Sequence, residues 1–69
     1  MKPIDQLTPR ERQIARMLGQ GKAPKVIAAE LGIAPVTVRQ MIYRVMEKTD
    51  TKTVVHLAVV MAQADGEEG

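Results

Sequence analysis

The sequence has 69 residues, which is enough for one small domain. It contains no cysteine and one histidine, which excludes a disulfide and a tetrahedral structural zinc site. Ten Lys and Arg residues against eight Asp and Glu residues give a net charge of +2, which by itself is too small to indicate a nucleic-acid partner. Hydrophobic residues make up 45% of the chain, but the aromatic residues amount to a single tyrosine, so the core must be aliphatic.

The first predicted helix begins at Pro9. Thr8 is a typical N-cap, proline suits the first helical position, and Glu11 completes a capping box that satisfies backbone N–H groups at the helix start. Gly19 and Gly21 are expected to end this helix.

Two further helices are predicted on either side of a very short turn. One begins near Pro24 and ends at Gly32, where a left-handed conformation favours glycine. The next begins at Pro35 and runs to about Lys48. Neither start carries a capping Ser, Thr, Asp or Asn side chain, because alanine precedes each proline.

A fourth helix is predicted from Val54 to about Ala64, capped by Thr53 or Thr51. The fold class is therefore all-α with four helices. We expect residues 1–64 to form a single helix-turn-helix domain and residues 65–69 to be a disordered acidic tail.

The short turn between the second and third helices carries the most informative spacing. Ala28 allows two helices to cross closely, Gly32 takes the turn conformation, and Val38 fills the joint between the helices. This spacing is typical of a helix-turn-helix, although a purely structural corner between two helices has similar requirements.

The wider pattern resembles the DNA-binding domain of LuxR/FixJ-type (GerE-like) regulators, over residues 7 to about 62. The resemblance implies that the third helix enters the major groove and that the fourth makes a two-fold dimer contact. The residues that carry it are Leu-Thr-Pro-Arg-Glu-Arg at 7–12, Gly21, Ile-Ala-Ala-Glu-Leu-Gly-Ile-Ala-Pro at 27–35, Thr37-Val38 and Lys48.

The third helix is expected to present one face to the core and the other to a partner. On DNA, Arg39 would pair with a guanine, Gln40 with an adenine, and Arg44 with a phosphate. The core side holds Val38, Met41, Ile42 and Val45, and the outer face holds Val36, Arg39, Gln40, Tyr43 and Glu47 with Arg44 at its edge. Further positive charge for contacts with the DNA phosphates would come from Arg10, Arg12, Arg16, Lys22 and Lys25.

The outer face also departs from the family pattern. Val36 and Tyr43 stand where polar or basic residues are usual, Met41 stands where histidine is common, and Glu47 adds a negative charge. Tyrosine, methionine and arginine are enriched in protein–protein interfaces. The face therefore suits either duplex DNA or a protein partner.

The fourth helix is apolar on two sides, so one side should be covered by another molecule. Val55, Val59 and Ala62 form the second stripe, which predicts a homodimer, or the capture of a related helix on another protein. His56 lies on the remaining, more polar side and is expected to be a surface or interface residue.

No pattern of catalytic residues is present, so the sequence predicts no enzyme activity, cofactor, metal or small-molecule ligand. With no export signal and no membrane span, the cytoplasm of a bacterial host is the expected location. Because the small size and the altered outer face also resemble those of bacteriophage anti-activators, we predict a stand-alone anti-activator that binds and inhibits a LuxR-type quorum-sensing transcription factor. The alternatives are a sequence-specific DNA-binding regulator of the LuxR/GerE type and a simple dimerisation module.

Overall fold

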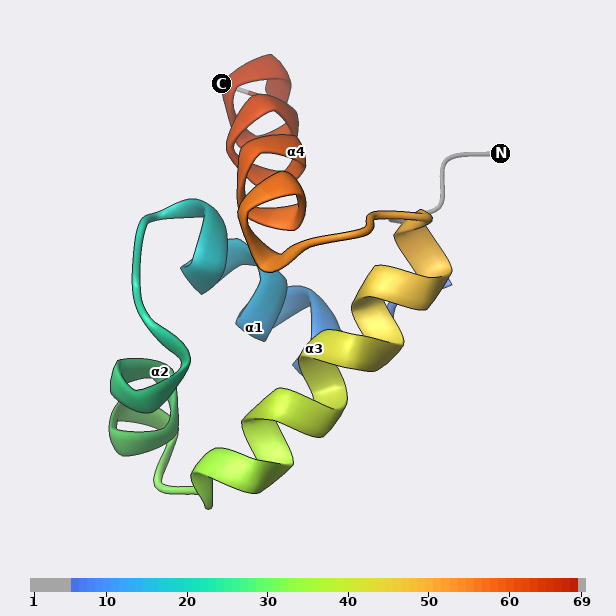
Figure 1. The fold of residues 1–69 in the computed structure, drawn as a ribbon. Coiled ribbons are helices and arrows are strands. Elements are labelled where there is room, and N and C mark those ends of the chain that lie inside the picture. Colours follow the sequence, from blue (N-terminus) through green and yellow to red (C-terminus); the bar gives the residue numbers. More distant parts are fainter. Residues whose placement is uncertain (1–5, 69) are drawn as a thin grey trace.

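The computed structural model describes residues 6–68, with side chains for residues 6–64, and this part of the chain forms four helices and no strand. They are α1 (Pro9–Gly19), α2 (Pro24–Leu31), α3 (Pro35–Thr49) and α4 (Val54–Glu68). Helix α1 packs against each of the other three, and Figure 1 shows α2 and α3 meeting at a short connection while α4 projects from the opposite end. The predicted all-α fold is confirmed.

The start of α1 has the predicted capping box. The Thr8 hydroxyl accepts a hydrogen bond from the Glu11 N–H at 3.1 Å, and the Thr8 N–H donates to the Glu11 carboxylate at 2.9 Å. The helix ends at Gly19, and Gly21 follows with a positive φ of 92°. This left-handed conformation favours glycine, so the chain can turn sharply towards α2.

The helix-turn-helix is formed by α2 and α3, between which the chain changes direction by 116°. Gly32 ends α2 with φ at 68°, as its position predicts. Ala23 and Ala34 are the N-caps of α2 and α3, and neither supplies a side-chain hydrogen bond. The 116° change of direction between α2 and α3 lies in the range typical of helix-turn-helix motifs.

The hydrophobic core lies where the four helices meet around α1. The predicted inner face of α3 is confirmed at Val38, Ile42 and Val45, whereas Met41 is half-buried at its edge. The buried hydrophobic residues are Leu7, Ile14, Ala15, Leu18, Ile27, Ala28, Val38, Ile42, Val45, Leu57 and Met61. This aliphatic core agrees with the composition.

Helix α4 begins at Val54 as predicted but extends further than predicted at its C-terminal end. Thr53 is its N-cap, since its hydroxyl accepts from the His56 N–H at 3.0 Å. Val54, in the first turn of the helix, is 38% exposed. The backbone remains helical to Glu68, four residues beyond the predicted end at about Ala64, because each added residue extends an existing helix and gains a hydrogen bond. Residue 69 of the predicted tail lies outside the described residues.

Among the described residues, no single helix is both long and apolar enough to cross a membrane. Helices α2 and α3 reach that length and composition only when counted together across their 116° bend.

Candidate nucleic-acid interface

The outer face of α3 is presented as the sequence predicted. At about 100° per residue, the side chains at positions 36, 40, 43 and 47 form one stripe opposite the buried valines and isoleucine. Val36 is 58% exposed and Tyr43 is 61% exposed, while Arg39 and Arg44 are exposed on opposite flanks of the stripe. The core thus fixes the rotation of α3, and a partner can reach this whole face.

Glu47 lies at the far end of this stripe from Val36. The two residues are eleven positions apart, which is about 16 Å along the helix at 1.5 Å per residue. Recognition helices contact bases mainly through their N-terminal residues. The negative charge of Glu47 is therefore remote from the end of α3 that would read bases, and it does not argue against a DNA partner.

The basic residues outside α3 do not form one cluster. Arg12 and Lys22 line an open hollow beside α1, together with Arg16. Arg10 is exposed outside this hollow and donates to Gln13 at 3.4 Å.

Two of the predicted phosphate contacts differ in how much charge they offer. The Lys22 ammonium lies 2.9 Å from the Glu30 carboxylate, which neutralises part of its charge. Lys25 is exposed in the first turn of α2 and lies outside the hollow beside α1. Lys22 is therefore a weaker candidate for phosphate binding than the sequence suggested.

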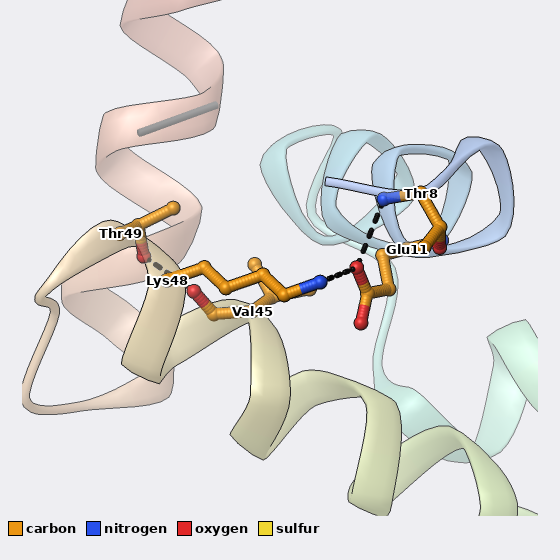
Figure 2. Close-up of polar contacts among 5 residues, drawn as sticks. All are labelled: Thr8, Glu11, Val45, Lys48 and Thr49. Carbon is orange, nitrogen blue, oxygen red and sulfur yellow. Dashed lines mark hydrogen bonds and ion pairs between the residues drawn. The ribbon is translucent and has the colours of Figure 1, made fainter. Parts of the chain in front are cut away.

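A partly buried ion pair holds α3 against α1, and sequence reasoning missed it (Figure 2). The Lys48 ammonium lies 2.7 Å from the Glu11 carboxylate, whose side chain is only 4% exposed. The hydrogen bond from Lys48 and that from the Thr8 N–H lower the pKa of Glu11, and together they outweigh the opposing effect of burial. The pair connects the start of α1 to the last turn of α3 and so helps to orient the outer face.

The end of α3 is shaped by local hydrogen bonds. The Thr49 hydroxyl donates to the Val45 carbonyl at 2.8 Å and lies 3.1 Å from the hydroxyl of the buried Thr51 (Figure 2 shows the first contact). Asp50 then takes a left-handed conformation with φ at 54°, and the chain turns into α4. Helix α3 thus ends within a residue of the predicted end at about Lys48, and aspartate is one of the few residues other than glycine that visit the left-handed conformation.

The second apolar stripe of α4 is exposed, as predicted. Val55 is 73% exposed and Val59 is 48% exposed, and Ala62 is exposed beside them. With Ala23, the N-cap of α2, and Pro24, its first residue, they line a mainly apolar hollow. His56 is exposed on another side of α4.

Residues 5–61 match the sequence profile of the family described as "Bacterial regulatory proteins, luxR family". The chain belongs to the luxR family. The transcriptional regulatory protein UhpA of Escherichia coli (strain K12) is 52% identical over 54 residues, which cover 78% of this chain and 28% of UhpA. The nitrate/nitrite response regulator protein NarL of the same strain is 38% identical over 60 residues, which cover 87% of this chain and 28% of NarL.

The luxR-family domain thus spans less than a third of the length of these curated relatives. No solved structure matches the chain. The relatives are named as regulators of transcription or of a response, and neither name refers to inhibition of another regulator. The comparisons therefore favour the alternative of a DNA-binding regulator over the anti-activator that we predicted from the sequence.

In this luxR-family domain, the described residues contain no group of three or more His, Cys, Asp or Glu side chains that could hold a metal ion. The candidate site is therefore taken to be the outer face of α3.

Proposed function

We propose that this domain binds duplex DNA sequence-specifically and regulates transcription, with α3 in the major groove. The supporting observation is the exposed outer face of α3, which follows a sharp turn and is held by a buried core on its opposite side. Arg39 reads a guanine, Gln40 reads an adenine, and Arg44 contacts a phosphate. Membership of a family of regulatory proteins supports the same function.

The test is fluorescence anisotropy with the purified protein and a randomised duplex pool, titrated at about 50 mM and about 200 mM salt. A protein that contacts several phosphates loses orders of magnitude in affinity between these conditions. For a duplex selected from the pool, we expect Arg39→Ala to weaken binding by about five- to 150-fold and to relax specificity at one base pair.

Arg44→Ala is the matched control for this experiment, because Arg44 is an exposed arginine on the other flank of the same helix. A phosphate contact carries no sequence information, so this variant should weaken binding to all duplexes by a similar factor. Equal losses for Arg39→Ala on selected and unselected duplexes would rule out base reading by Arg39.

We further propose that two copies associate through Val55, Val59 and Ala62 of α4 and bind two half-sites. Val59→Asp should convert the dimer to a monomer, because it places an unpaired charge in an apolar interface. Sedimentation velocity measures the change. Val26→Asp is the control, since Val26 is a similarly exposed valine (47%) on α2. A dimer that survives Val59→Asp would contradict this assignment.

The second candidate is the anti-activator, in which the same face binds a LuxR-type transcription factor of a bacterial host. The observation that favours it is the exposure of Val36 and Tyr43, because exposed tyrosine is frequent at the centres of protein interfaces. The DNA titration separates the two functions. If the protein binds no duplex at low salt, the outer face of α3 is assigned to protein recognition. Adding the protein to a LuxR-type regulator bound to its DNA would then test inhibition.

A further inference from the structure

Val36 is exposed without a role in the fold. It is the second residue of α3 and is 58% exposed, whereas Val38, two positions later, is fully buried. A β-branched residue gains little from an exposed helical position, because its side chain loses rotamer freedom there. The helix alone therefore gives no reason for valine at position 36, and a contact outside the monomer would supply one.

The surroundings of Val36 fit a single small apolar group. Arg39 and Gln40 follow at the three- and four-residue spacing that makes side chains neighbours on a helix, and both are exposed. The next apolar side chain on the stripe is Tyr43, about 10 Å further along the axis and beyond Gln40. Val36 is thus one apolar side chain beside two polar ones, and it offers no continuous apolar surface for a protein to cover.

In the major groove, the apolar group that bases present is the C5-methyl of thymine. Resting on the function proposed above, we propose that Val36 is a specificity-determining residue that contacts this methyl group. Val36 and Gln40 lie about 6 Å apart along α3, which is less than two base-pair steps of 3.4 Å. The thymine should therefore lie within two base pairs of the base that Gln40 reads.

The experiment uses a duplex selected from the randomised pool by the full chain. Each thymine is replaced singly by deoxyuridine, which keeps the base pair and removes the methyl group, and dissociation constants are measured by anisotropy. We expect one thymine in each half-site at which the replacement weakens binding about fourfold, the effect of one buried methyl group.

Val36→Ala identifies the side chain that contacts this methyl group. This variant should bind the thymine duplex more weakly than the wild type and should no longer distinguish thymine from deoxyuridine at that position. Val26→Ala is the matched control, because it shortens an exposed valine outside α3 and should keep the fourfold preference. Circular dichroism checks that both variants keep their helix content.

The outcomes separate this inference from the function on which it rests. If the wild type binds the thymine duplex but no deoxyuridine replacement matters, or if Val36→Ala keeps the preference, methyl reading by Val36 is wrong and DNA binding stands. If the wild type binds no duplex even at about 50 mM salt, both proposals are wrong.

Discussion

Replacing Glu11 with alanine is expected to lower the free energy of unfolding by about 3 kcal/mol. The change removes the acceptor for the Thr8 N–H and leaves the Lys48 ammonium without its buried partner. Breaking a buried ion pair costs about 3–5 kcal/mol, and we take the lower end because the Lys48 side chain is 34% exposed. Urea unfolding followed by circular dichroism at pH 7 measures the loss.

Glu30→Ala is the control for this prediction. Glu30 pairs with Lys22 at 2.9 Å, but their side chains are 45% and 35% exposed, so the loss should be within about 1 kcal/mol. Similar losses for the two variants would show that burial of Glu11 adds nothing to its ion pair.

The contribution of Glu11 should also depend on pH. Its pKa in the folded state lies below the ordinary value of 4.5, so folding favours the ionised carboxylate. The resulting stabilisation is fully present above about pH 4.5 and is lost as the pH falls through the lower, folded-state pKa. The difference in unfolding free energy between the wild type and Glu11→Ala should therefore shrink below about pH 4.5. A constant difference down to the acid transition would be inconsistent with this ion pair.

Gly19→Val is expected to lower the free energy of unfolding at least as much as Glu11→Ala does, by about 3 kcal/mol or more. A Cβ atom added at Gly19 would lie 2.9 Å from the Met61 Cβ and 3.0 Å from the Ala62 backbone nitrogen. These atoms belong to the rigid part of α4, so the two helices must separate. The gain in helix propensity over glycine, about 0.5 kcal/mol, is too small to offset the clash.

Thermal unfolding of Gly19→Ala and Gly19→Val should show a loss that grows with side-chain size. Gln13→Val is the control, because Gln13 is exposed on the same helix and its hydrogen bond with Arg10 is an exposed one of 3.4 Å. If Gly19→Val were as stable as this control, α1 and α4 would not be in close contact at this point.

The helices, and their ends except the C-terminal end of α4, follow from local sequence. The capping box at Thr8, the glycine at position 32 and the apolar spacing in α3 each act within a few residues, so they can be read from the chain directly. The exposed side chains of the candidate site can also be predicted from local sequence. Once Val38, Ile42 and Val45 are assigned to the core, helical geometry determines which α3 side chains are exposed.

The contacts between distant segments could not be predicted in this way. Glu11 and Lys48 are 37 positions apart, and no periodic pattern joins them. The close approach of α4 to Gly19 was also not predicted, because the glycine was interpreted only as the end of a helix and not as a position that leaves room for a neighbouring helix. Both features depend on how helices pack, which spacing along one helix does not encode.

The exposure of Tyr43 has a practical consequence for spectroscopy. The chain contains one tyrosine and neither tryptophan nor phenylalanine, so its intrinsic fluorescence comes from one side chain on the outer face of α3. Because 61% of this residue is already in contact with solvent, unfolding should change its emission little. A ligand that covers α3 should quench or shift it directly. The unlabelled protein therefore carries its own optical reporter of what occupies this surface.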